Sequence, residues 1–148
     1  MQRFAALKRL SNEHHRGLVI ARRAREPQDD PAGAWVELRR RFADALEPHF
    51  QREEHGLLRA MQDAGERTLV ERTAEHRAMR VMINAGGPDD LAAFAKMLAD
   101  HIRFEESELF ETAQRVLAPD ALAALQDLHD RQASPACGPR KAGTASPG

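Results

Sequence analysis

The sequence contains no tyrosine, one cysteine, and few aromatic residues, which make up 5% of its 148 positions. Strands favour aromatic and β-branched residues, and no stretch alternates polar with apolar positions as a half-buried strand does. Alanine and arginine, which suit helices, are abundant instead. The composition therefore predicts an all-α protein.

The single cysteine, Cys137, lies in a segment rich in proline, glycine and serine. One cysteine forms no internal disulfide, so we expect a reducing, cytoplasmic location. A structural zinc site built from several thiolates is excluded for the same reason. We expect residues 1–132 to form one domain and residues 133–148 to be a disordered C-terminal tail.

Long apolar runs are also missing. No stretch is suited to span a bilayer, and the N-terminal segment becomes charged too soon to contain the apolar region of a signal peptide. Neither sign of charge dominates, because 22 basic and 23 acidic residues give a net charge of -1. That balance gives no electrostatic reason to expect nucleic acid or a membrane as a partner.

Helical periodicity divides the chain into four long segments and a shorter fifth. We expect helices over about residues 2–25, 34–63, 67–84, 90–117 and 119–132, with Pro48 kinking the second. Gly86 and Gly87 should end the third helix, and Asp89 or Asp90 should cap the fourth. This pattern favours an antiparallel up-down-up-down four-helix bundle with a short fifth C-terminal helix.

Each of the four long helices carries a histidine on the apolar stripe that should face the core. The second and fourth helices add a glutamate four residues later, on the same helix face. The resulting set is His14, His49, Glu53, His76, His101 and Glu105. A lone inward histidine is more often a hydrogen-bonded core residue, and a single histidine–glutamate pair is common on solvated helix faces.

The combination is more specific than its parts. Burying two carboxylates without positive charge costs several kcal/mol each, as an order of magnitude, and metal ions supply that charge. Calcium and magnesium prefer shells of oxygen alone, whereas mixed imidazole and carboxylate ligands suit iron or manganese. The set is too large for one ion and favours two ions bridged by Glu53 and Glu105.

A faint internal repeat supports this interpretation. The segment "EHHRGL" in the first helix resembles "EHRAM" in the third, and "HFQREEHGLL" in the second resembles "HIRFEESELF" in the fourth. The repeated unit is a pair of helices used twice, which predicts two matching halves around a pseudo-twofold axis.

These motifs, in this order over about residues 4–117, resemble the hemerythrin-like, or HHE cation-binding, domain family. The resemblance implies a four-helix bundle with a non-haem di-iron centre. By that resemblance His14 and His49 ligate one iron, His76 and His101 ligate the other, and Glu53 and Glu105 bridge them.

The chain departs from the oxygen-carrying hemerythrins on the third helix, where they have a second histidine four residues from the first. Arg72 and Arg80 stand at the flanking positions here, and an arginine cation cannot ligate a metal. A carboxylate, with Glu106 or Glu54 ahead of Glu75, or else water is expected to fill the gap. An exchangeable position on the His76 and His101 side would favour reaction with oxygen or peroxide there.

The chain contains three further histidines, whose positions on their helices can also be predicted. His15 competes with His14 as the ligand from the first helix, and helical geometry favours His14. His55 falls on the polar side of its helix, and His129 is expected at the surface of the fifth helix.

Three kinds of function are compatible with these sequence features. The first is a di-iron protein that binds or senses oxygen, another small diatomic ligand, peroxide or cellular iron. The alternative is an enzyme of catalase, peroxidase or ferroxidase type that uses the same centre. A metal-free interaction bundle is the third, and the sequence names no protein partner.

Overall fold

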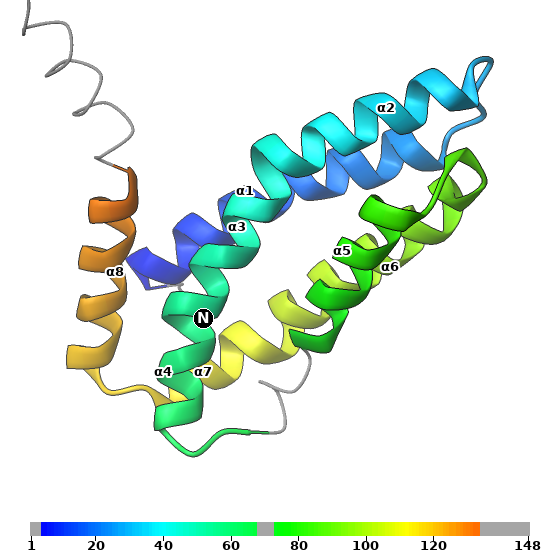
Figure 1. The fold of residues 1–148 in the computed structure, drawn as a ribbon. Coiled ribbons are helices and arrows are strands. Elements are labelled where there is room, and N and C mark those ends of the chain that lie inside the picture. Colours follow the sequence, from blue (N-terminus) through cyan, green and yellow to red (C-terminus); the bar gives the residue numbers. More distant parts are fainter. Residues whose placement is uncertain (1–3, 68–72, 134–148) are drawn as a thin grey trace, which may run out of the picture.

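The computed structural model describes residues 4–67 and 73–133. Every regular element within these ranges is a helix, and none of these residues forms a strand. The all-α prediction is therefore confirmed. Helices α1 (Ala5–Arg25) and α2 (Pro31–Arg41) run side by side, as do α5 (Ala74–Ala85) and α6 (Leu91–Phe104), and α1 also packs along α6 (Figure 1). The molecule is a helical bundle.

The first helix, α1, spans Ala5–Arg25 and ends in a basic turn, which suits the negative end of the helix dipole. Its start is tied to the end of the fourth long helix, because the backbone N–H of Phe4 donates to the side-chain oxygen of Gln114 at 2.9 Å.

The second long helix is continuous but changes its winding twice. It consists of α2 (Pro31–Arg41), the π-helical turn η1 (Phe42–Leu46), α3 (Glu47–Arg52), a second π turn η2 (Glu53–Leu57), and α4 (Leu58–Asp63). The carboxylate of Asp30 caps its start by accepting from the N–H of Gly33 at 3.0 Å. Pro48 was expected to kink this helix, and η1 ends two residues before it. A proline lacks the N–H of an α-helical hydrogen bond, which accords with the wider turn there.

The third long helix differs most from expectation. Helix α5 spans Ala74–Ala85, whereas the sequence predicted a start near Arg67, which is not helical. Arg72, which was part of the predictions, lies outside the described residues, as do Cys137 and the predicted tail from residue 134.

A tight turn connects α5 to the fourth long helix. At Gly86 a Cβ atom would lie 2.6 Å from the carbonyl oxygen of Met82, so the turn requires glycine. Asp90 stabilises the turn by accepting from the N–H of Gly87 at 2.8 Å. The 3-10 turn η4 (Pro88–Asp90) then leads into α6 (Leu91–Phe104), the π turn η5 (Glu105–Leu109) and α7 (Phe110–Val116).

The fifth helix, α8 (Pro119–Ala133), packs on α1 and on the π turn η2 (Figure 1). Gly56 permits the close approach, because a Cβ atom there would lie 3.0 Å from Leu125 and 3.3 Å from Leu128. Within the described ranges, no helix combines the length and apolarity that a membrane crossing requires.

Two apolar clusters form the core. One contains Trp35, Phe42 and Phe94, and the other contains Leu57, Leu109 and Phe110. Along the first, second and fourth long helices, the histidines and glutamates singled out above occur where the chain passes from one cluster to the other. The fold therefore places a polar layer between two hydrophobic ones.

Candidate metal centre

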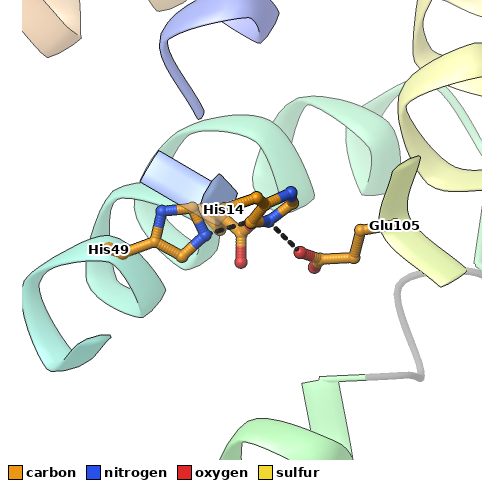
Figure 2. A group of neighbouring side chains, drawn as sticks. His14, His49 and Glu105 are labelled. Atoms are coloured by element: carbon orange, nitrogen blue, oxygen red, sulfur yellow. Dashed lines mark hydrogen bonds and ion pairs between the residues drawn. The ribbon is translucent and has the colours of Figure 1, made fainter. Parts of the chain in front are cut away.

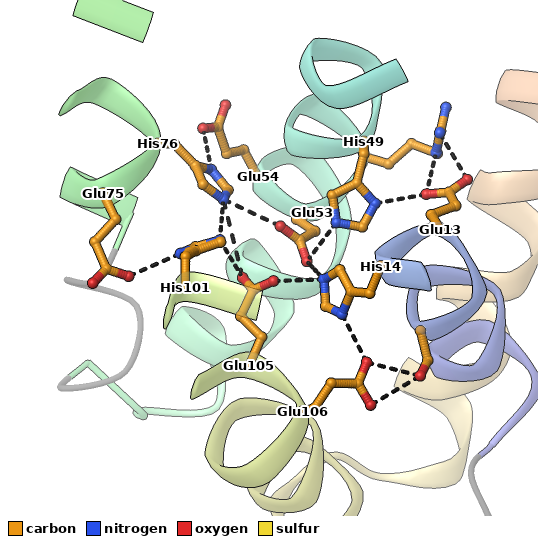
Figure 3. Close-up of polar contacts among 12 residues, drawn as sticks. Glu13, His14, His49, Glu53, Glu54, Glu75, His76, His101, Glu105 and Glu106 are labelled. Carbon is orange, nitrogen blue, oxygen red and sulfur yellow. Dashed lines mark hydrogen bonds and ion pairs between the residues drawn. The ribbon is translucent and has the colours of Figure 1, made fainter. Parts of the chain in front are cut away.

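Six side chains from the four long helices form the polar layer. They are His14 from α1, His49 from α3, Glu53 from η2, His76 from α5, His101 from α6 and Glu105 from η5. None is more than 4% exposed. All six were predicted from the sequence, and the structure brings them together (Figure 3).

The two glutamates occupy equivalent positions in the local structure. Glu53 begins η2 and Glu105 begins η5, each four residues after a histidine of its own helix. A π turn inserts an extra residue into the helical ladder and is frequent at functional sites. Each histidine–glutamate pair shares a helix face, and the winding changes at its glutamate.

The Nε2 atoms of the four histidines point inward, toward the two carboxylates. His14 Nε2 lies 2.8 Å from Glu105 Oε1, which connects the first and fourth long helices (Figure 2). His49 Nε2 lies 3.1 Å and His76 Nε2 lies 3.2 Å from the two oxygens of Glu53. His101 Nε2 lies 3.2 Å from Glu105 Oε2.

Several of these atoms face one another without a hydrogen bond. Both oxygens of Glu53 and the Nε2 atom of His49 have no hydrogen-bond partner among the described residues, although all are buried. Buried polar atoms are almost always satisfied, so this cluster requires an explanation. Ligands of one metal ion, each about 2.0–2.2 Å from it, stand about 3 Å from one another, which is the spacing found here.

The six residues divide into two overlapping groups. His14 and His49 form one with both glutamates, and His76 and His101 form the other with the same two glutamates. Each residue offers one ligand atom, and the atoms of a group lie within 4.8 Å of one another. Each group has two histidines, as the resemblance implied, and the exchangeable position expected on the His76 and His101 side stays a prediction.

The Nδ1 atoms of the same rings point outward, each to a different carboxylate, and we call these four the outer carboxylates. The pairs are Glu106 with His14 (2.7 Å), Glu13 with His49 (2.7 Å), Glu54 with His76 (2.8 Å) and Glu75 with His101 (2.8 Å). Figure 3 shows all four contacts around the inner cluster. This ring of carboxylates was not predicted, although a glutamate precedes the histidine in both "EH" motifs and follows the inner glutamate in both "EE" motifs.

Three of the outer carboxylates accept further hydrogen bonds, and Glu54 accepts its own from Arg80. Arg52 donates to both oxygens of Glu13, at 3.3 and 2.7 Å, and the hydroxyl of Ser11 donates to Glu106 at 2.7 Å. Glu106 was expected among the metal ligands, with Glu54 as a rival. Both carboxylates contact the outer nitrogen of a histidine instead, and neither belongs to the two inner groups.

Carboxylates on both sides raise the pKa values of the buried rings. Burial lowers the pKa of His14, but hydrogen bonds to Glu105 and Glu106 outweigh it and raise the pKa to about 11. For His49, burial is outweighed by the charge of Glu53 and the bond to Glu13, giving a pKa of about 9.

Burial and nearby carboxylates act in the same way on the His76 and His101 side of the cluster. The pKa of His101 rises to about 10, because burial is outweighed by the charge of Glu105 and hydrogen bonds to Glu105 and Glu75. Burial raises the pKa of Glu53, but the facing charge of His49 holds it well below the usual range. The buried carboxylate of Glu53 therefore requires positive charge beside it, from protons on the rings or from metal ions.

The remaining histidines lie elsewhere. His15 and His55 are exposed, as the helical geometry predicted. The prediction for His129 was wrong, because its side chain is 0% exposed. It projects from α8 toward Gly56, where an added Cβ atom would lie 3.5 Å from the Nε2 of His129, and neither ring nitrogen has a hydrogen-bond partner among the described residues. The apolar stripe of a single helix did not reveal this contact with η2.

The comparisons with known proteins agree with this geometry. A family model described as "Hemerythrin HHE cation binding domain" matches residues 5–113, which include all six inner residues and the four outer carboxylates. No curated protein and no solved structure matches the chain. The chain belongs to the hemerythrin HHE cation-binding domain family.

Proposed function

We propose that this chain binds two non-haem iron ions, bridged by Glu53 and Glu105, and uses them to bind or sense a small oxidising ligand. His14 and His49 complete one ion's protein ligands, and His76 and His101 complete the other's. The proposal rests mainly on the orientation of the four imidazoles, whose outer nitrogens are all bound to carboxylates and whose inner nitrogens converge.

The outer carboxylates determine which nitrogen is available. An ionised carboxylate only accepts hydrogen bonds, so each Nδ1 must carry the proton that it shares with its outer carboxylate. In a neutral ring the Nε2 atom then presents a lone pair. This arrangement, with a carboxylate on the far nitrogen, is the usual support of a metal-ligating histidine.

The chemistry of the donors favours iron. Imidazole with carboxylate suits iron or manganese, and calcium or magnesium would prefer oxygen alone. Iron supplies reversible binding of oxygen and one-electron redox chemistry when bound. Each group offers four ligand atoms, one from each residue. A six-coordinate ion would therefore have positions left for a small ligand such as oxygen, another diatomic molecule or peroxide.

The surrounding residues keep the site dry and rigid. The ring of His14 stacks on Phe110 with centroids 5.1 Å apart, and the ring of His76 stacks on Phe50 at 3.9 Å. These contacts fix the planes of two ligands and shield them with apolar surface. A buried and rigid site suits small ligands better than a bulky organic substrate.

We also propose a helix topology and a location for the protein. The proposal includes an antiparallel up-down-up-down arrangement of the four long helices, with α8 as an addition, and a cytoplasmic location. We propose no role for nucleic acid or a membrane. The same open positions also suit an enzyme that acts on peroxide or oxygen, which is the alternative function.

Adjacent histidines provide the sharpest test of the metal proposal. We expect wild-type protein loaded anaerobically with ferrous iron to retain two ions per chain. His14→Ala should lose at least one of them, whereas His15→Ala, which changes an exposed neighbour, should retain both. Equal iron content in the two variants would contradict the proposal.

An activity assay separates the two functions. A binding or sensing protein should show an optical change with oxygen or peroxide and little turnover. Sustained peroxide consumption that depends on His14 and not on His15 would favour the enzyme.

A further inference from the structure

Arg80 connects two acidic side chains across the surface of the bundle. Its Nε and Nη2 atoms donate to the two oxygens of Glu47, at 2.7 and 2.8 Å. Its Nη1 and Nη2 atoms donate to the two oxygens of Glu54, at 2.9 and 3.1 Å. An arginine held by two carboxylates through four hydrogen bonds has little freedom, because its planar fork matches each carboxylate.

The connection continues to the polar layer. Glu54 Oε2 accepts from Arg80 and also from His76 Nδ1, at 2.8 Å. On the inner side, His76 Nε2 lies 3.2 Å from Glu53. The ring of Phe50, on which His76 stacks, lies 5.7 Å from the guanidinium carbon of Arg80. Arg80 thus contacts both the hydrogen-bond partner and the stacking partner of His76.

The internal repeat shows that this arrangement is confined to one half. Aligning His76 with His14 places Arg80 opposite Leu18, and aligning His49 with His101 places Glu47 opposite Ala99. Neither Leu18 nor Ala99 can form an ion pair. On that side the outer carboxylate Glu106 takes a hydroxyl hydrogen bond from Ser11.

A surface ion pair usually contributes little to stability. Arg80 is different in position, since its side chain is 25% exposed and its partners Glu47 and Glu54 are 28% and 24% exposed. Such partly buried, charge-assisted bonds hold a carboxylate more firmly than exposed ones do. The arrangement therefore fixes the location of Glu54, and through it the orientation of His76.

We propose that Arg80 is a positioning residue for the His76 and His101 metal group, which it orients through Glu54. The proposal rests on the metal centre proposed above. In this role Arg80 supports the histidine of its own helix through the carboxylate on that histidine's outer nitrogen. Partners of this kind typically change metal affinity by about 10–100-fold when removed.

The test follows each histidine separately. Zinc is a diamagnetic probe that accepts imidazole and carboxylate ligands, so the ring ¹⁵N signals of the four inner histidines can be followed during a zinc titration. In Arg80→Leu, the signals of His76 and His101 should reach their midpoints at zinc concentrations about 10-fold higher or more. The midpoints of His14 and His49 should move much less.

Two arginine variants serve as controls. Arg52→Leu removes the support of Glu13, so its effect should appear first at His49. Arg40→Leu removes an exposed arginine that pairs with Glu37 and Asp44, and it should leave all four midpoints in place. Arg80→Lys keeps the charge without the planar fork and should restore affinity only in part.

The outcomes separate the two proposals. If zinc moves no histidine signal of the wild type, the metal centre itself is refuted, and this inference with it. If zinc binds the wild type and Arg80→Leu leaves the His76 midpoint unchanged, or shifts all four equally, only the role of Arg80 is refuted. If Arg80→Leu does not fold, Glu47→Gln provides the same test, because it removes the outer anchor and leaves the bond to Glu54.

Discussion

The Nε2 atoms of His76 and His101 face each other at 3.1 Å, while their Nδ1 atoms are bound to Glu54 and Glu75. Two neutral rings in these tautomers would place two lone pairs opposite each other, which is unfavourable in a buried site. A proton or a metal ion between the rings removes the conflict.

Glu53 should be needed for both ions. It is 0% exposed and lies within 3.5 Å of the Nε2 atoms of His14, His49 and His76. Glu53→Gln keeps the shape but replaces an ionised oxygen with an amide that donates. We expect the iron content to fall below one ion per chain, as measured by elemental analysis. Glu37→Gln, which changes a side chain that is 43% exposed, should bind iron as the wild type does.

Metal binding should release protons. The raised pKa values of His14, His49 and His101, about 11, 9 and 10, mean that these rings are protonated near neutral pH before a metal binds. A ligating imidazole must be deprotonated, so binding should release about three protons or more at pH 7. Calorimetry in buffers of different ionisation enthalpy measures this number. A release near zero would show that the rings are neutral beforehand.

The stability of metal-free protein should depend on pH through the same rings. A histidine whose folded pKa lies above its unfolded value of about 6.5 stabilises the fold fully below that value. The stabilisation is lost as the pH rises through the folded pKa values of about 9, 10 and 11. The melting temperature of chelated protein should therefore fall on the alkaline side of neutrality. Metal-loaded protein should be affected less there, because ions replace the protons.

His129 should have the opposite effect. Burial lowers its pKa, so the unfolded chain binds the proton more readily and this residue reduces stability as the pH falls below about 6.5. Its ring nitrogens also lack hydrogen-bond partners among the described residues. His129→Leu should therefore stabilise the protein by about 1–3 kcal/mol, and more in acid than at neutral pH. Denaturant unfolding measures this, and a destabilised variant would contradict it.

The exposed His55 provides the control for that substitution. His55→Leu should change the free energy of unfolding by no more than about 0.5 kcal/mol. If both variants shift stability equally, burial of His129 is not the cause.

The inner cluster could be predicted from the sequence because its residues recur at short, fixed spacings along single helices. A histidine and a glutamate four residues apart share a helix face, and the repeat of that pair in two helices fixed Glu53 and Glu105 as partners. The ends of the helices were less predictable, and α5 begins later than the apolar pattern suggested.

The roles of the outer residues could not be predicted in the same way. Glu105 and Glu106 are adjacent, and only the packing of α1 against η5 places one inside the cluster and the other on the outer nitrogen of His14. Arg80 meets Glu47, which is 33 residues away along the chain. Such contacts depend on how helices pack, and the period of one helix carries no information about them.

Anomalous diffraction at the iron absorption edge, from crystals of iron-loaded protein, tests the central claim most directly. The account predicts two peaks per chain, one beside the Nε2 atoms of His14 and His49 and one beside those of His76 and His101. Glu53 and Glu105 should contact both. A single peak, no peak within this cluster, or ions bound only at surface carboxylates would contradict it.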